Sequence, residues 1–323
     1  MGQKKPKVVI IGGVESSYIC LKQLFKYNFD IQKVYGYQPK STKNVSGFRD
    51  LSPFCDKNEI PFQSFKQINT FEDEIKTLDC EYIFVVGISQ LVSLNIINSA
   101  KIGSIGFHPT NLPQGRGRAP LAWLVNDLND GSATFFVLEE TADTGAILDK
   151  RIFKVEPIDT AKDVENKMLA AMEEALDSLL PKLKKLWWDP KAQDEGISSE
   201  YGLRKPEDGL IQWDISAREL ERLIKAVAFP HPGAFTFLNF ERINVLNARE
   251  EKKMSIKGVQ GRVLKIKMNE CLVQTADGLL WIEVDDINKY LIRVGSLLGY
   301  KSDLEIFKMK NEIKKLKKVV GLK

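Results

Sequence analysis

The chain has 323 residues, of which 43% are apolar and 28% are charged, and its formal net charge is +4. This composition is typical of a globular protein, and the length allows two domains. Because no run of about 18 apolar residues occurs, we expect no membrane-spanning helix. The two histidines are too few and too far apart to suggest a metal site.

The N-terminus and the cysteines bear on the cellular compartment. The first residues lead directly into an apolar strand and lack the apolar segment and cleavage site of a signal peptide. The four cysteines are scattered along the chain without the paired spacing of a metal or redox motif. We therefore expect a cytoplasmic protein with reduced thiols.

The chain begins with an apolar strand expected over residues 7–11, followed by Gly12-Gly13 and a helix that Ser16 can cap. A glycine turn between a strand and a helix can present backbone N–H groups to an anion. Gly12 and Gly13 are therefore candidate substrate contacts, and a tight turn without a ligand is an equal alternative. The turn lacks the G-x-G-x-x-G spacing, so a nicotinamide cofactor is not indicated.

Strands and helices then alternate. We expect strands over 31–37 and 82–86, and helices over 48–57 and 70–78, with a polar loop over 38–47. The apolar run over 82–86 is the clearest buried parallel strand. This alternation predicts an α/β domain with a mostly parallel, Rossmann-like sheet.

The most informative stretch runs from His108 to Pro120. It follows an apolar run over 102–107 that is typical of a buried strand, and it precedes a helix expected from Pro120 to Leu128. Open α/β sheets place their chemistry at the C-terminal ends of such strands, and an imidazole titrates near neutral pH. Further on, Asp143-Thr144-Gly145 follows another apolar strand, expected over 133–138.

These two elements resemble the paired motifs of the folate-dependent formyltransferase family. The family pairs a loop of the form H-x-S-L-L-P-x-x-R-G-x-x-P with a D-T-G loop, and this chain has HPTNLPQGRGRAP from His108 onwards. The resemblance implies that N10-formyltetrahydrofolate donates a formyl group to an amine. It also implies that His108 is the base or the oxyanion-facing imidazole, and that Asp143 is its acidic partner.

The resemblance also implies where the co-substrates bind. In the family, the loop after the strand expected over 82–86 borders the folate through backbone groups, and Thr141 and Ala142 lie directly before the D-T-G turn. Arg116 and Arg118 could bind phosphate groups, or could instead hold the loop by pairing with carbonyls or carboxylates. Thr110 stands where serine is common and keeps the hydroxyl as a substrate contact. The expected folate-binding loop comprises Gly87, Ile88, Ser89, Gln90 and Leu91.

The chain departs from the family at Gly106. The family usually has an asparagine two residues before the histidine, and its amide helps to hold the oxyanion, whereas glycine offers no side-chain donor. Loss of one such donor costs on the order of 100- to 1,000-fold in rate. Asn111 is our preferred replacement as a catalytic residue because its amide is a donor in the same loop. Ser104 and Thr110 are the other candidates.

Downstream, Asp159-Thr160 is expected to cap a long amphipathic helix over 161–186. We assign residues 1–187 to a catalytic domain, 188–212 to a linker and 213–323 to a C-terminal domain. The linker and the segment after it resemble the family patterns R-x-P-x-D-G-x-I and P-x-P-G-A-F. A helix over 216–228 and five short strands predict a small OB-like β-barrel. These strands are expected over 235–238, 243–248, 261–267, 272–275 and 279–284.

The C-terminal end is rich in lysine, with seven lysines and two glutamates in residues 305–323. A basic arm for nucleic acid is one interpretation. We favour a solvated terminal helix because aromatic residues are not interleaved with the charges and arginine is lacking. In that interpretation four apolar side chains pack inward, namely Ile306, Phe307, Ile313 and Leu316.

Within the family, the favoured acceptor is the amino group of a nucleotide-linked amino sugar, used for a surface polysaccharide or glycoprotein. Methionyl-tRNA is the alternative, but the 38–47 loop has two lysines and no arginine, so a nucleic-acid partner is disfavoured. Water, in formyltetrahydrofolate hydrolysis, and a non-catalytic role in ligand binding also stay open. Sugar formyltransferases are often dimers, so a homodimer is a further expectation of the resemblance.

Overall fold

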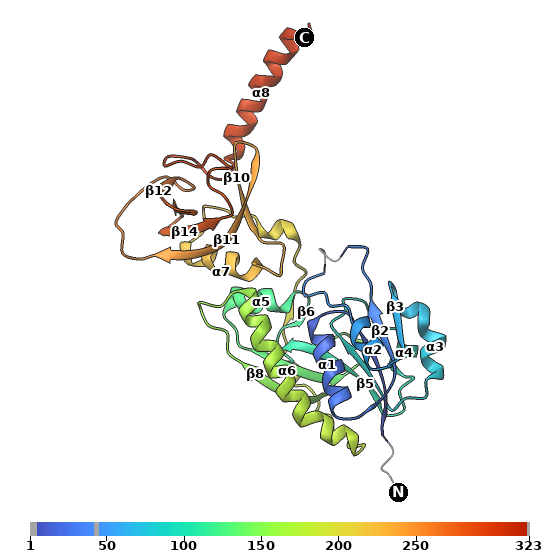
Figure 1. Ribbon diagram of the computed structural model, residues 1–323. Coiled ribbons are helices and arrows are strands. Elements are labelled where there is room, and N and C mark those ends of the chain that lie inside the picture. The colour runs from blue at the N-terminus through green and yellow to red at the C-terminus, as the bar shows by residue number, and fades with distance from the viewer. Residues whose placement is uncertain (1–4, 42–44, 322–323) are drawn as a thin grey trace. The chain divides into compact units, whose positions relative to one another are not determined.

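The computed structural model describes residues 5–41 and 45–321, and these form two compact units that divide between Arg204 and Lys205 (Figure 1). Part of the loop expected over 38–47, namely residues 42–44, lies outside the described residues. The division falls inside the stretch that we expected to link two domains. None of the helices in the described ranges is both long and apolar enough to cross a membrane.

The first unit contains a mixed sheet. Its strands are β1 (Lys7–Gly12), β2 (Asp30–Tyr37), β3 (Phe62–Phe65), β4 (Tyr82–Val86), β5 (Gly103–Thr110), β7 (Gly131–Val137) and β8 (Ile147–Phe153). Within the described residues their order is β3-β2-β1-β4-β5-β7-β8. The pairs from β3 to β5 are parallel, and those that include β7 are antiparallel. The mostly parallel α/β sheet predicted from the sequence is confirmed.

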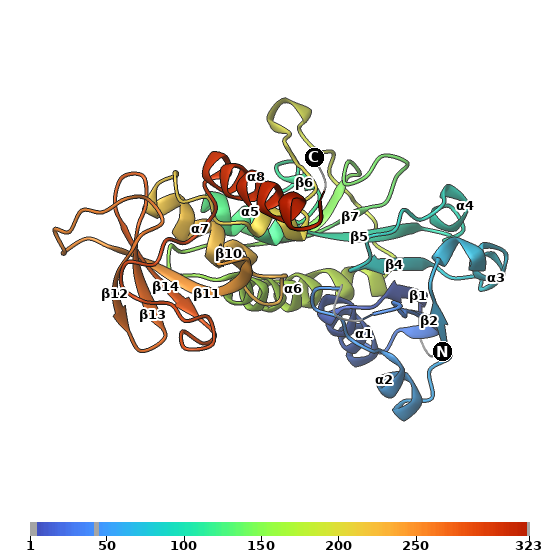
Figure 2. The ribbon, with the colours of Figure 1, turned by 90° about the horizontal axis from the view of Figure 1, so that it is seen from above.

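Helices and a 3-10 turn cover both faces of this sheet (Figure 2). They are α1 (Glu15–Lys26), α2 (Ser52–Lys57), η2 (Ile68–Phe71), α3 (Glu72–Thr77), α4 (Leu94–Ile97), α5 (Pro120–Asp127) and α6 (Ala161–Lys184). Helix α6 begins at a capping box, in which Thr160 Oγ1 accepts from the Asp163 amide. Its buried stripe packs on β7 and β8 and lies beside α1.

The opposite face of the sheet is covered by η2, α3 and α4. Val9 and Ile11 of β1 join Ile68, Ile75 and Ile96 in one buried cluster. Successive strand residues point to opposite faces, so the strands need apolar residues at nearly every position. Because both faces are covered, polar chemistry is confined to the ends of the strands.

The last part of the first unit contains η3 (Glu195–Ile197) and β9 (Glu200–Tyr201). Strand β9 pairs in parallel with β6 (Arg116–Gly117), which lies in the loop after His108. Residues that we interpreted as linker are thus bonded to the loop that carries the first motif.

The second unit begins with η4 (Pro206–Gly209) and α7 (Ala217–Val227). Its described strands form an antiparallel sheet in the order β10-β11-β14-β13-β12. This finding confirms the smaller C-terminal β domain. Apolar side chains of α7 and the strands form its core, which the residues after β14 complete. The strands are β10 (Ala234–Leu238), β11 (Glu241–Glu251), β12 (Val263–Lys267), β13 (Glu270–Gln274) and β14 (Leu279–Val284).

The chain then continues into α8 (Ser302–Val319). Our expectation that its apolar side chains pack inward is wrong. Ile287, Tyr290 and Leu298 already complete the core of the second unit ahead of the helix. The four side chains are instead exposed, at 44% for Ile306, 63% for Phe307, 53% for Ile313 and 62% for Leu316.

Candidate active site

His108 is buried within β5, two residues before the last residue of the strand. We expected the strand to end at Phe107, but it continues through a register shift between His108 and Thr110. His108 Nε2 lies 2.9 Å from the carbonyl oxygen of Gly115. A carbonyl can only accept, so Nε2 carries the hydrogen, and in the neutral ring Nδ1 holds the lone pair. The fold therefore selects Nδ1 as the nitrogen that can accept a proton.

Asp143 lies beside this nitrogen, with its Oδ2 atom 3.6 Å from His108 Nδ1. The same oxygen accepts a 3.0 Å hydrogen bond from the Gly117 amide. Strand β7 runs antiparallel to β5, so the loop after it must turn back toward His108. Asp143 has a φ of +60°, and a Cβ at Gly145 would lie 1.7 Å from the Val137 carbonyl oxygen. The D-T-G sequence suits this return because Asp tolerates the left-handed conformation and glycine allows the close approach.

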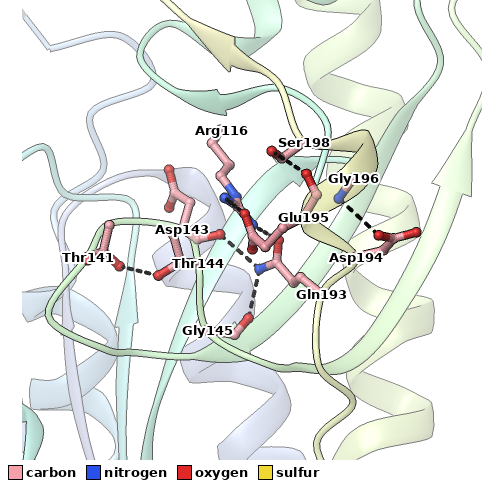
Figure 3. Close-up of polar contacts among 10 residues, drawn as sticks. All are labelled: Arg116, Thr141, Asp143, Thr144, Gly145, Gln193, Asp194, Glu195, Gly196 and Ser198. Atoms are coloured by element: carbon pink, nitrogen blue, oxygen red, sulfur yellow. Dashed lines mark hydrogen bonds and ion pairs between the residues drawn. The ribbon is translucent and has the colours of Figure 1, made fainter.

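Gln193 holds the D-T-G loop in place (Figure 3). Its side-chain amide nitrogen donates to the carbonyl oxygens of Asp143 at 2.8 Å and Gly145 at 2.7 Å. Its side-chain oxygen accepts from Arg116 at 2.8 Å. One amide thus joins the D-T-G loop to the loop after His108. No spacing rule in the sequence points to Gln193.

The side chain of Arg116 is buried and makes a bidentate ion pair with the Glu195 carboxylate, with N–O distances of 2.9 and 2.6 Å. The hydrogen bond from Arg116 holds the pKa of Glu195 below its usual range. These contacts favour the alternative in which Arg116 holds the loop rather than a phosphate. Arg118, two residues on, has an exposed side chain, although its amide donates to the Tyr201 carbonyl. Arg118 is therefore the loop arginine that faces solvent.

The segment around β9 also fixes the carbonyl that His108 contacts. Ser199 Oγ accepts from the Gly115 amide at 2.9 Å, and the Ser199 carbonyl accepts from the Arg116 amide at 3.0 Å. Thr110 Oγ1 donates to the Gly115 carbonyl at 3.2 Å. Ser199 is a second residue of this segment that reasoning from the sequence missed.

Gly106 has no room for a side chain. A Cβ there would lie 2.7 Å from Phe136 Cζ and 2.8 Å from Leu138 Cδ2. Phe136 is buried, and it is paired with Gly106 across β5 and β7. The place where family members carry an amide side chain is therefore filled by apolar atoms. The substitution is matched by its neighbours.

Asn111, our preferred replacement donor, follows the end of β5 and is half-buried. Its side-chain oxygen accepts from Lys150 Nζ at 2.8 Å. This contact fixes the amide so that its NH₂ group is the end left to donate to a ligand. Asn111 and Thr110 also line a cavity of about 280 Å³, together with Gln114, Ser199 and Tyr201.

The contacts of the Gly12-Gly13 turn distinguish the two alternatives that the sequence left open, an anion site and a tight turn without a ligand. Ser17 Oγ accepts from the amides of Gly13 at 2.9 Å and Val14 at 3.1 Å, and it donates to the Val86 carbonyl at 2.6 Å. The Gly13 carbonyl in turn accepts from the Arg49 amide. The contacts of Gly13 thus match the tight-turn alternative rather than an anion site.

The loop Gly87–Leu91 follows β4, the strand next to β5. Val85 is paired with Gly106, so extending that register places Gly87 level with His108. Gln90 anchors the loop by bonding the Ile68 amide and the Lys66 carbonyl, while the Leu91 side chain is 78% exposed. Thr141 and Ala142 are exposed in the loop that carries Asp143.

Known proteins resemble this chain in sequence. The family model "Formyl transferase" matches residues 26–180, and "Formyl transferase, C-terminal domain" matches residues 204–289. The bifunctional polymyxin resistance protein ArnA of Wigglesworthia glossinidia brevipalpis is 30% identical over 246 residues. That match covers 75% of this chain but only 38% of the length of that relative.

Solved structures show the same fold. An N-formyltransferase from Helicobacter canadensis, in complex with folinic acid and dTDP-3-aminofucose, has a TM-score of 0.66 at 17% identity and covers 86% of this chain and 99% of its own. HypX from Aquifex aeolicus, in complex with tetrahydrofolic acid, has a TM-score of 0.62 at 14% identity, and the match covers 86% of this chain and 44% of HypX. The methionyl-tRNA formyltransferase from Clostridium thermocellum has a TM-score of 0.54 at 20% identity, and the match covers 77% of this chain and 95% of that enzyme.

The packing around Gly106 yields a stability prediction. Gly106→Asn should lower the free energy of unfolding by about 1–3 kcal/mol because the new side chain overpacks against Phe136 and Leu138. The loss should be smaller when Phe136→Leu is already present, because the shorter side chain vacates the position of Cζ. Denaturant unfolding of the four members of this double-mutant cycle measures the coupling. An equal loss in both backgrounds would contradict the steric explanation.

The Arg116 contacts yield a second prediction. Arg116→Met should lower the melting temperature by about 4–8 °C because it removes charge-assisted hydrogen bonds to both Gln193 and Glu195. Glu195→Gln is the matched control and should have a smaller effect, because the Glu195 side chain is 65% exposed and the Arg116–Gln193 bond remains. Thermal unfolding followed by circular dichroism compares them. Similar shifts of the melting temperature in the two variants would show that the hydrogen bond from Arg116 to Gln193 contributes little to stability.

Proposed function

The chain belongs to the formyl transferase family. We propose that it is a formyl-transfer enzyme, which moves the formyl group of N10-formyltetrahydrofolate to the amino group of a nucleotide-linked amino sugar. The observation that carries this proposal is the pairing of His108 Nδ1 with Asp143 Oδ2 at 3.6 Å. The four cysteines are buried and free, which supports a reducing, cytoplasmic setting.

The reaction needs a base beside the attacking amine. The amine nitrogen forms a bond to the formyl carbon, and the bond from that carbon to N10 of the folate then breaks. The proton lost by the amine passes to His108 Nδ1, and N10 gains a proton as it leaves. Asp143 stabilises the positively charged imidazole, and the Gly115 carbonyl holds its other nitrogen in place. The burial of His108 keeps this geometry rigid.

We assign the remaining roles by position. The NH₂ group of Asn111 is the donor that replaces the family asparagine at the developing oxyanion. Gly87, Ile88, Ser89, Gln90 and Leu91, with Thr141 and Ala142, form the folate-binding surface. This assignment is supported by the register that places Gly87 level with His108. Thr110 and the exposed Arg118 are the substrate-binding residues of the His108 loop.

Two observations favour a nucleotide-linked sugar over a tRNA. The Helicobacter canadensis structure, which holds a dTDP-linked amino sugar, is similar over 86% of this chain at a TM-score of 0.66, against 0.54 over 77% for the methionyl-tRNA enzyme. The formal net charge of +4 is also small for a protein that binds nucleic acid. Arg118 supplies a planar cation that suits a sugar-linked diphosphate.

A substrate panel tests the proposal directly. The protein is incubated with N10-formyltetrahydrofolate and UDP-, dTDP- or GDP-linked amino sugars, or with methionyl-tRNA, and the product is identified by mass spectrometry. We expect one amino sugar to gain the mass of a formyl group, with tetrahydrofolate released in equal amount. Formylation of methionyl-tRNA and of no amino sugar would show that the acceptor is the tRNA. Folate binding without turnover on any acceptor would indicate a non-catalytic protein.

The catalytic pair yields a further prediction on the accepted substrate. His108→Ala should lower kcat by about 10²- to 10⁴-fold because it removes the base. Asp143→Asn should also lower kcat while preserving the loop, since Asn tolerates the left-handed φ and can still accept from the Gly117 amide. Ser198→Ala, a neighbouring hydroxyl that donates to the Glu195 carbonyl, is the control and should keep full activity. Turnover by His108→Ala at the native rate would refute the mechanism.

A further inference from the structure

Helix α8 displays an apolar stripe that its own unit does not cover. The stripe recurs at intervals of three and four residues, which correspond to the a and d positions of a heptad repeat. Such a stripe is stable in water only when it is packed against another surface. Its members are Ile306, Met309, Ile313 and Leu316, exposed at 44%, 48%, 53% and 62%, and Val320 directly after the helix, at 64%.

From Glu305 onwards, the charged residues beside the stripe have one sign on each flank; Asp303, at the e position of the first turn, precedes them. In the same heptad frame, Glu305 and Glu312 take the g positions, and Lys310 and Lys317 take the e positions. In a parallel pair of helices, each g residue faces the e residue five positions further along the partner. Glu305 would then face Lys310 of a second copy, and Glu312 would face its Lys317.

The antiparallel arrangement is disfavoured by the same charges. There, g flanks meet g flanks and e flanks meet e flanks, so glutamates would face glutamates and lysines would face lysines. Glu305 and Glu312 make ion pairs with Lys308 and Lys315 of their own helix. The second pair is exposed on both sides, and in the first Lys308 is exposed while Glu305 keeps 20% of its side chain exposed, so both pairs are weak. They do not prevent the glutamates from bonding across an interface.

The apolar residues also indicate the number of helices. The a positions hold the β-branched Ile306 and Ile313, and the d positions hold Met309 and Leu316. β-Branched residues at a with leucine at d favour two strands in a parallel coiled coil. The remaining lysines of α8 lie at outer positions, where they stay in water, which accounts for the basic character of this end of the chain.

We propose that α8 is a dimerisation helix that pairs with α8 of a second copy of this chain in a parallel, two-stranded coiled coil. The helix spans about 27 Å, which is short for a coiled coil that stands alone. The apolar surface extends beyond it, because Phe240 and Tyr300 at its base are 76% and 43% exposed. Both rings line a cavity of about 300 Å³ with Glu305 and Lys308. This surface is available to strengthen the contact between copies.

The mass of the full chain in solution tests the proposal. At tens of micromolar, light scattering on the eluting protein should give a mass approaching twice the 36.6 kDa of one chain. Ile313→Asp places a charge in the stripe and should weaken the dimer at least tenfold. Lys314→Asp places the same group on the outer face and should leave the dimer intact. A wild-type mass of one chain at all concentrations, or an unchanged dimer in Ile313→Asp, would overturn the proposal.

Charge reversal tests the role of the flanks. The pair Glu305→Lys with Glu312→Lys, and the pair Lys310→Glu with Lys317→Glu, should each weaken self-association because like charges then meet. Mixing the two variants should restore a dimer that contains one copy of each. Circular dichroism checks that every variant stays folded. Reversal without any effect on association would place the contact elsewhere.

A crosslink tests the orientation. The variant Ile306→Cys places a thiol near one end of the helix, so two copies form a disulfide under mild oxidation only when the helices run in parallel. The four native cysteines are buried, and burial raises the pKa of each thiol, so they contribute little background. A dimer that forms no disulfide in this variant would overturn the parallel arrangement.

Discussion

The hydrogen bond from His108 to the Gly115 carbonyl is the constraint on which the candidate site depends. It assigns the hydrogen to Nε2 and so leaves Nδ1, on the side of Asp143, to accept a proton. The Gly115 carbonyl keeps its direction because Ser199 bonds the amide of the same residue. The tautomer of one imidazole is thus set by a segment more than eighty residues away in the chain.

Asp143 is positioned by the same principle. The loop that carries it leaves an antiparallel strand and returns to His108, so backbone hydrogen bonds to neighbouring strands cannot fix it along its whole length. Gln193 supplies these bonds through its side chain and transfers the restraint to Arg116. Arg116 is buried, so its guanidinium donors need protein partners, and loss of the bond to Gln193 would leave one donor without its partner. Arg116 therefore helps to position Asp143, because it holds Gln193, which in turn holds the loop that carries Asp143.

The sequence predicts the fold better than the site. The apolar runs of β1, β4 and β5 and the amphipathic pattern of α6 are local signals, and the structure confirms the elements that they predict. Gln193 and Ser199 act only through long-range contacts, so no local pattern marks them. The packing of Phe136 against Gly106 is likewise a contact between strands. From the sequence alone, Gly106 is only the loss of a side-chain donor. The structure shows in addition that Phe136 fills the space that a side chain at position 106 would need.

Helix α8 shows why periodicity alone cannot identify the surface that an apolar stripe contacts. A stripe at heptad spacing suits the core of the same unit and a second copy equally well. The core of the second unit is complete before α8 begins, which removes the first choice. The glutamates on one flank and the lysines on the other then distinguish partners, because only a parallel copy places opposite charges along both flanks. In this helix the charged residues carry the specificity, and the apolar residues carry the affinity.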